Sequence, residues 1–221
     1  MSYLVIKAEL EQHQVELVAV SKTKPIEAIQ AIYDQGQRDF GENKVQEMEA
    51  KYQILPKDIR WHLIGHLQKN KVKYIAPFVH LIHSVDSLEL LFEINKQAFK
   101  NNRLLDVLLQ IHIAREESKF GLDKTELIEI LDMNESKNAG LQNIRIRGLM
   151  GMATFSDDED LIRKEFNGLK DLFTFVQQSY FLTEKSFSLL SMGMSSDYRI
   201  AIEAGSNMVR IGSLLFGNRT T

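Results

Sequence analysis

Residues 17–25 read Leu-Val-Ala-Val-Ser-Lys-Thr-Lys-Pro, an apolar, β-branched run that ends in a polar turn. Such a run predicts a buried strand, and the closing proline suits the first turn of a following helix. Because side chains alternate along a strand, Val18, Val20 and Lys22 share one face. If that face lines the inside of a barrel, Lys22 lies at its mouth, at the carboxyl end of the strand.

A lysine in this place has an apolar wall below it and solvent above. Burial and a second ammonium group, here that of Lys24, both disfavour the charged form of Lys22. The neutral amine is the form that attacks a carbonyl carbon to make a Schiff base. The alternative is that Lys22 is an ordinary strand-end lysine whose charged end reaches into solvent.

Outward from this segment, the chain alternates short β-like runs with helical patterns. Strands are expected at 17–21, 39–42, 61–65, 78–83, 104–113, 144–150, 186–190 and 208–211. Each is followed by a helical segment or short turn, and alternating βα units imply a parallel sheet. Eight units predict a closed (β/α)8 TIM barrel, for which ~200 residues is the lower end of the usual length. A doubly wound open sheet is the alternative, but no G-x-G-x-x-G follows the first strand.

The composition narrows the class of protein. The net charge is −3. Among 221 residues there are only three prolines and no Gly/Ser-rich linker, so we expect one compact domain over residues 1–221. Having no cysteine, it has no disulfide and no thiolate metal site, which fits a cytoplasmic location. No basic cluster indicates nucleic-acid binding. No apolar run approaches the ~20 residues that span a membrane, and no signal-peptide pattern begins the chain.

Two loops near the carboxyl terminus have the composition of an anion site. They are Ser-Met-Gly-Met-Ser-Ser at 191–196 and Arg-Ile-Gly-Ser at 210–213. In (β/α)8 barrels the loops after strands seven and eight often bind phosphate. Glycine lets backbone N–H groups approach an anion, and serine hydroxyls add donors. By the period of two, Arg210 and Gly212 share a strand face.

Pyridoxal 5′-phosphate (PLP) matches this set of groups. Its aldehyde would take Lys22, its phosphate would lie on Ser195, Gly212 and Ser213, and its ring nitrogen would face Arg210. An arginine that is always charged disfavours protonation of that nitrogen and weakens the cofactor as an electron sink. The alternative is that the glycines of both loops form tight turns and that Arg210 is a surface ion-pair partner.

Six segments, in the same order along the chain, resemble the family of pyridoxal phosphate homeostasis proteins. These are single-domain relatives of the alanine racemase barrel (fold type III). The segments are AVSKTKP (19–25), FGENKVQE (40–47), WHLIGHLQKNK (61–71), RGLMGMA (147–153), LSMGMSSD (190–197) and VRIGSLLFG (209–217). The resemblance implies that Lys22 carries the cofactor as a Schiff base and that Asn43 and His62 line its rim. It also implies a phosphate site at Ser195, Gly212 and Ser213, with Arg210 facing the ring nitrogen.

The sequence departs from this family in two places. Only about 15 residues precede the first strand, where the family has a longer helix, and Ser213 stands where family members commonly have threonine.

Two histidine pairs, His62/His66 and His80/His83, resemble pairs of metal ligands. No convergent carboxylate is evident in the sequence, so we interpret these histidines as structural and expect no metal site.

The resemblance implies a carrier rather than an efficient enzyme. Alanine racemases use a second base, a tyrosine from a further domain, and a chain ending at Thr221 has no room for that domain. We therefore expect a monomer that holds PLP and hands it to apo-enzymes, without robust catalysis. Two alternatives are a PLP-dependent enzyme with weak racemase-like activity on amino acids, and a phosphosugar barrel enzyme that uses a Schiff-base lysine without a cofactor.

Overall fold

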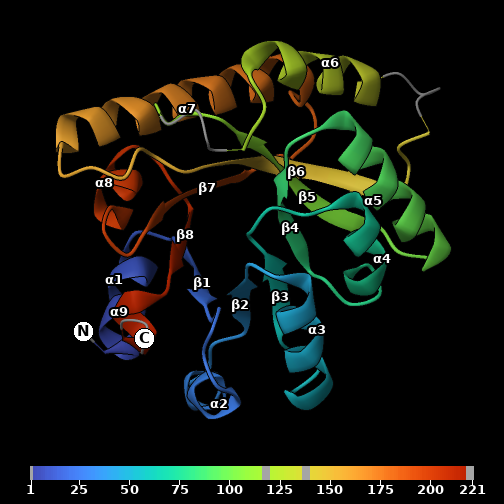
Figure 1. Cartoon of the computed structure of the whole chain (residues 1–221). Coiled ribbons are helices and arrows are strands. Elements are labelled where there is room, and N and C mark those ends of the chain that lie inside the picture. The colour runs from blue at the N-terminus through green and yellow to red at the C-terminus, as the bar shows by residue number, and fades with distance from the viewer. Residues whose placement is uncertain (1, 116–119, 136–139, 218–221) are drawn as a thin grey trace.

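Eight parallel strands close into a barrel in the order β1 to β8 (Figure 1). The computed structural model describes residues 2–115, 120–135 and 140–217. The strands are β1 (Glu16–Val20), β2 (Asp39–Glu42), β3 (Arg60–Leu63), β4 (Leu81–Val85), β5 (Leu105–Ile111), β6 (Ile144–Gly151), β7 (Leu189–Met194) and β8 (Met208–Ile211). The expected (β/α)8 barrel is confirmed, because β1 pairs with both β2 and β8.

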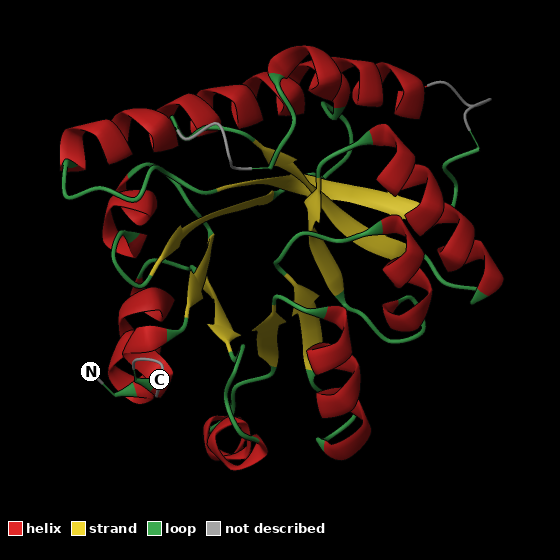
Figure 2. Cartoon of the chain, viewed as in Figure 1, coloured by secondary structure: helices red, strands yellow, loops and turns green. Residues whose placement is uncertain are grey.

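Helices surround the barrel and cover the outer faces of its strands (Figures 1 and 2). They are α1 (Tyr3–Gln12), α2 (Ile26–Asp34), α3 (Val45–Ile54), the 3-10 turn η1 (Lys69–Lys71) with α4 (Val72–Ile75), α5 (Leu88–Lys100), α6 (Lys124–Glu135), α7 (Glu159–Tyr180), α8 (Tyr198–Glu203) and α9 (Ser213–Phe216). None of them, within the described residues, is both long and apolar enough to cross a membrane.

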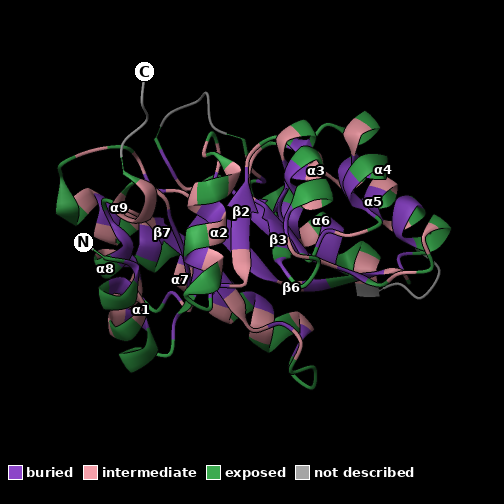
Figure 3. Ribbon diagram, turned by 90° about the horizontal axis from the view of Figure 1, so that it is seen from below, coloured by how far each residue is buried: buried purple, intermediate pink, exposed green. Residues whose placement is uncertain are grey.

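The hydrophobic core has two parts. The larger lies between strands and helices, where Phe40, Trp61 and Phe166 are fully buried. The smaller fills the inside of the barrel and consists of Val18, Leu81, Leu108, Met150 and Met208. Figure 3 shows the consequence, with buried strands at the centre and exposed residues on the outer sides of the helices.

Helix α7 shows how the pattern of apolar residues produces this arrangement. Five apolar residues of this helix recur at spacings of four and three, which places them on one face. All of them are buried, namely Ile162, Phe166, Leu169, Phe173 and Val176. Its first turn is capped by Asp158, whose carboxylate accepts the N–H of Leu161 at 3.0 Å.

Strand ends and one cap differ from the expectation. Strand β4 begins at Leu81 rather than at 78, because the N–H groups of Phe78 and Val79 still bond to the Ile75 carbonyl in the preceding turn. Strand β7 covers 189–194 rather than 186–190. The spacing of Asp86 and Glu89 resembles a capping box and predicts a helix cap at Asp86. Helix α5 is instead capped by Ser87, whose hydroxyl accepts the N–H of Leu90.

Candidate functional site

A cavity of about 680 Å³ opens at the carboxyl ends of the strands. Six of the seven predicted site residues line it: Lys22, Asn43, Ser195, Arg210, Gly212 and Ser213. Parallel strands of a barrel all end at the same rim, so their following loops surround one space. The barrel therefore brings together residues from the first two and the last two strands.

Lys22 lies in the turn directly after β1 and is half-buried. The β1 run ends inside the barrel with Val20, which also lines the cavity. The turn is closed by the N–H of Lys24, which donates to the Ser21 carbonyl at 3.0 Å. Thr23 adopts a φ of 62°, a left-handed conformation that is strained for a β-branched residue. The turn therefore has a backbone conformation at Thr23 that threonine by itself does not favour.

A buried ionic cluster beneath this turn holds it in place. The Lys51 ammonium donates to the Ser21 carbonyl and to carboxylate oxygens of Glu42 and Glu47, each at 2.7 Å. Glu47 also accepts the N–H of Thr23 at 2.5 Å. Burial raises the pKa of Glu42, although the charge of Lys51 opposes that rise. The cluster fixes the backbone on both sides of Lys22, and sequence reasoning missed it.

The loops after β7 and β8, which the sequence predicts to bind an anion, form one end of the cavity. The Gly212 N–H donates to the Ser195 hydroxyl at 3.2 Å, which joins the two loops. Helix α9 begins at Ser213, and the first N–H groups of a helix have no intrahelical acceptor. The Lys24 ammonium donates to the carbonyls of Phe216 and Gly217 at 3.1 and 2.9 Å. This contact ties α9 to the Lys22 turn.

Arg210 forms part of the cavity wall and is 4% exposed. Its guanidinium donates from Nη1 to the carbonyl and hydroxyl of Ser191 at 2.8 and 2.7 Å, and from Nη2 to the Gly151 carbonyl at 3.0 Å. Burial lowers the pKa of Arg210 to about 10, so it remains a cation at neutral pH. The alternative of a surface ion-pair partner is therefore wrong.

Asn43 reaches the rim through a close approach of two loops. It follows β2, and Gly65 follows the neighbouring β3. A Cβ on Gly65 would lie 2.5 Å from the Asn43 carbonyl oxygen, which is shorter than any ordinary contact. Glycine is therefore required where the β3 loop passes Asn43.

His66, rather than His62, lies at the rim from the β3 side. The His66 ring stacks on Phe120 with 4.1 Å between ring centroids, and its Nδ1 lies 3.0 Å from an Asp86 oxygen. His66, Gln110, Phe120 and Met152 line the cavity, although sequence reasoning had not selected them. The available signal was the place of His66 directly after the strand, where barrel site residues gather.

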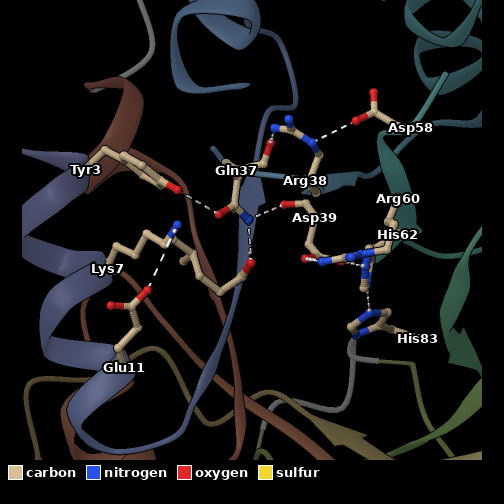
Figure 4. A network of polar contacts seen from close by, with 11 residues as sticks. Tyr3, Lys7, Glu11, Gln37, Arg38, Asp39, Asp58, Arg60, His62 and His83 are labelled. Atoms are coloured by element: carbon tan, nitrogen blue, oxygen red, sulfur yellow. Dashed lines mark hydrogen bonds and ion pairs between the residues drawn. The ribbon is translucent and has the colours of Figure 1, made fainter. Parts of the chain in front are cut away.

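His62 is not among the residues that line the cavity, so its expected place at the rim is corrected. It lies within β3, paired with Gly41 and Leu81, and is 1% exposed. Figure 4 shows its ring between Asp39 and His83. Its Nε2 is 3.0 Å from Asp39 Oδ1 and its Nδ1 is 2.9 Å from His83 Nε2. Both ring nitrogens are therefore occupied within the barrel.

The expectation that no carboxylate converges on the histidines is also wrong. Asp39, His62 and His80 offer ligand atoms that lie within 4.8 Å of one another. Arg60, however, donates to both Asp39 oxygens, with Nε 2.6 Å from Oδ1. Burial alone would raise the pKa of Asp39, but bonds from Arg60 and His62 outweigh it and hold that pKa well below its usual range. We interpret the group as a hydrogen-bonded cluster neutralised by Arg60.

Comparison with known proteins shows which class of protein has this barrel. Residues 3–220 match the family model described as alanine racemase, N-terminal domain. Alanine racemase from Bartonella henselae has a TM-score of 0.69 at 19% identity, covering 97% of this chain and 59% of that chain. At that identity the similarity concerns the fold alone.

Relatives of higher sequence identity define the family within this class. The pyridoxal phosphate homeostasis protein of Aquifex aeolicus (strain VF5) is 42% identical over 205 residues, which are 92% of this chain and 87% of that protein. PipY of Synechococcus elongatus PCC7942, solved with PLP bound, has a TM-score of 0.84 at 35% identity, covering 96% of this chain and 98% of that chain. The chain belongs to the family of pyridoxal phosphate homeostasis proteins.

Proposed function

We propose that the chain binds PLP in this cavity and holds it by a Schiff base to Lys22. Ser195, Gly212 and Ser213 bind the phosphate, Arg210 faces the ring nitrogen, and Asn43 lies at the rim. The observation that carries the proposal is the placement of Lys22, Arg210 and both glycine–serine loops around one cavity. The relative solved with PLP bound supports the same ligand.

The residues present fit the functional groups of PLP. The Lys22 turn carries the amine that would hold the aldehyde carbon of PLP as a Schiff base, formed with loss of water. The Ser195 hydroxyl accepts the Gly212 N–H and keeps its own proton to donate to a phosphate, and the first turn of α9, which begins at Ser213, adds backbone donors. Bound PLP supplies electron withdrawal from a carbon attached to its imine nitrogen. A cationic Arg210 limits that withdrawal, because it disfavours a proton on the ring nitrogen.

We propose that the physiological role is to hold PLP and release it to apo-enzymes, as a cytoplasmic monomer without robust catalysis. Support comes from the name of the Aquifex aeolicus relative and from the limited electron withdrawal expected beside Arg210. The test mixes the loaded protein with an apo-enzyme that needs PLP and follows recovery of that enzyme's activity. Racemisation of an amino acid at a steady rate, without transfer, would support the enzyme alternative instead.

Covalent attachment is tested by absorption and chemical reduction. The protein loaded with PLP is expected to absorb visible light, to lose that band with borohydride, and to carry a pyridoxyl group on the peptide that contains Lys22. Lys22→Ala should abolish the label, whereas Lys24→Ala, a neighbouring lysine with a different role, should keep it. A label on another lysine in the wild-type protein would refute the assignment of Lys22.

A further inference from the structure

A chain of hydrogen bonds runs through the inside of the barrel from the cavity to the opposite end. Arg210 Nη1 donates to the Ser191 hydroxyl at 2.7 Å, and that oxygen lies 3.1 Å from His83 Nδ1. His83 Nε2 lies 2.9 Å from His62 Nδ1, and His62 Nε2 lies 3.0 Å from Asp39 Oδ1. The five residues come from five strands, β8, β7, β4, β3 and β2.

The two ends of this chain determine its direction. A guanidinium only donates hydrogen bonds, and a carboxylate only accepts them. Ser191 therefore accepts from Arg210 and has its own proton left to donate to His83 Nδ1. His83 then donates from Nε2 to His62, and His62 donates from Nε2 to Asp39. With both histidines neutral, the carboxylate end therefore makes each the Nε2–H tautomer, and every bond in this hydrogen-bond chain points the same way; a protonated His62 would instead reverse the bonds on either side of His83.

The surroundings favour a neutral His83. His83 is completely buried, and burial, together with the nearby Arg210 cation, lowers its pKa well below the usual value. His62 is faced by Asp39 from β2, by His83 from β4 and by the ring of His80, with centroids 5.4 Å apart. Arg60 neutralises Asp39 at the far end (Figure 4), and Asp197 contributes negative charge near Arg210.

We propose that His62, His83 and Ser191 are positioning residues that connect the Asp39 carboxylate to Arg210 and hold its guanidinium toward the ligand. The inference rests on the proposed function, since it assigns the Arg210 cation to the ring nitrogen of PLP. The proposal makes a specific claim about the orientation of the Ser191 hydroxyl. With His83 accepting, the hydroxyl proton points away from Arg210 and an oxygen lone pair points toward it. If the chain reversed, His83 and Arg210 would both donate to the same oxygen.

The first test needs no ligand. Nitrogen-15 chemical shifts of the histidine rings in the ligand-free protein report which nitrogen carries the proton. At neutral pH, both His62 and His83 are expected to show a protonated Nε2 and an unprotonated Nδ1. A protonated Nδ1, or an imidazolium, on either residue would overturn the proposal whether or not the protein binds PLP.

The second test removes the far end of the chain. Asp39→Asn eliminates the charge that fixes the direction, although residue 39 does not line the cavity. We expect an altered tautomer at His83, a changed pH profile of the PLP absorption band, and roughly 3- to 10-fold weaker PLP binding. The control is Asp106→Asn. Asp106 lies near the start of β5, pairs with Arg145 and Arg147, and takes no part in the chain of hydrogen bonds.

The outcomes separate the two proposals. If Asp39→Asn folds and keeps the wild-type tautomers and PLP spectrum, or if Asp106→Asn changes them equally, the positioning role is refuted. If Asp39→Asn fails to fold, Ser191→Ala is used with the same readouts, because it breaks the chain beside Arg210 with a smaller change. If the wild-type protein binds no PLP, the proposed function fails, while the nitrogen-15 measurement still decides whether the chain has the inferred direction.

Discussion

At the scale of single residues, the site depends on buried cations that are each held by several hydrogen bonds. The Arg210 guanidinium bonds to Ser191 and Gly151, and the Lys51 ammonium bonds to Ser21 and two carboxylates. Buried charges persist only when hydrogen bonds and opposite charges offset their desolvation. Because of these partners, each cation holds a fixed position beside or beneath the cavity.

Replacing Arg210 by glutamine should change the spectrum of bound PLP while preserving the fold. Glutamine is uncharged, so a proton on the ring nitrogen is no longer disfavoured by a neighbouring cation. The absorption band and its pH dependence should shift relative to wild type, as measured on protein with an unchanged circular dichroism spectrum. An unchanged band in folded, loaded protein would place the ring nitrogen away from Arg210.

Replacing Lys51 by methionine should destabilise the protein by roughly 3 kcal/mol, because Glu42 loses the counterion in its buried site. The added substitution Glu42→Gln should recover part of that loss, since it removes the uncompensated charge. Urea unfolding measures both effects. Lys57→Met, on an exposed lysine, is the control and should change stability by no more than about 0.5 kcal/mol. Equal effects at Lys51 and Lys57 would contradict the ionic role of the cluster.

At the scale of elements, the loops around the cavity depend on backbone conformations that other residues do not easily adopt. Gly193, near the end of β7, has a φ of 96°, and a Cβ there would lie 2.6 Å from Ala201 Cβ and 2.9 Å from Tyr198 Cα. This contact lets α8 pack closely against β7. The position of Ser195, two residues later, depends on it.

Gly193→Ala should therefore destabilise the protein by at least about 2 kcal/mol and weaken phosphate binding, because both φ and packing oppose the new methyl group. Gly168→Ala is the matched control, since Gly168 lies within α7 with no atom within 4 Å of an added Cβ. That change should stabilise the helix by about 0.5–1 kcal/mol. Thermal or urea unfolding distinguishes the two, and a harmless Gly193→Ala would show that the loop relaxes freely.

At the scale of the whole molecule, the closed barrel isolates a histidine from water. His83 is neutral in the folded protein because burial lowers its pKa, whereas an unfolded histidine titrates near 6.5. Below pH 6.5 the unfolded state therefore binds a proton that the folded state does not. Stability contributed by a neutral His83 is complete above this pH and is lost as the pH falls.

The free energy of unfolding should decrease below pH 6.5, with His83 contributing up to about 1.4 kcal/mol per pH unit. His83→Gln should reduce this slope, because the variant has no proton to gain on unfolding. Urea titrations at several pH values between 5 and 7 measure it. His13→Gln, at an exposed histidine, controls for the removal of a histidine as such. Parallel slopes for wild type and His83→Gln would contradict the buried neutral state.

Much of the fold and of the rim was predictable from the sequence because the signals are local. The alternation of apolar strands and amphipathic helices is a periodicity of neighbouring residues, and it led to the confirmed barrel. Lys22 could be placed because it follows an apolar strand by two residues and shares a face with Val20. The glycine–serine loops could be placed because barrel topology puts the last two loops on the same rim.

Tertiary structure decided where side chains lie along the barrel axis and which residues of distant strands meet. The alternation of side chains along a strand predicts which face of β3 His62 occupies, but not how far it lies from the cavity along the barrel axis. The register of β3 with β2 and β4 puts its ring below the cavity. Asp39 reaches His62 because residue 39 begins the strand next to β3. Ser191 meets His83 across 108 residues only because the barrel closes. Such contacts depend on the register and packing of all eight strands at once, which no local pattern contains.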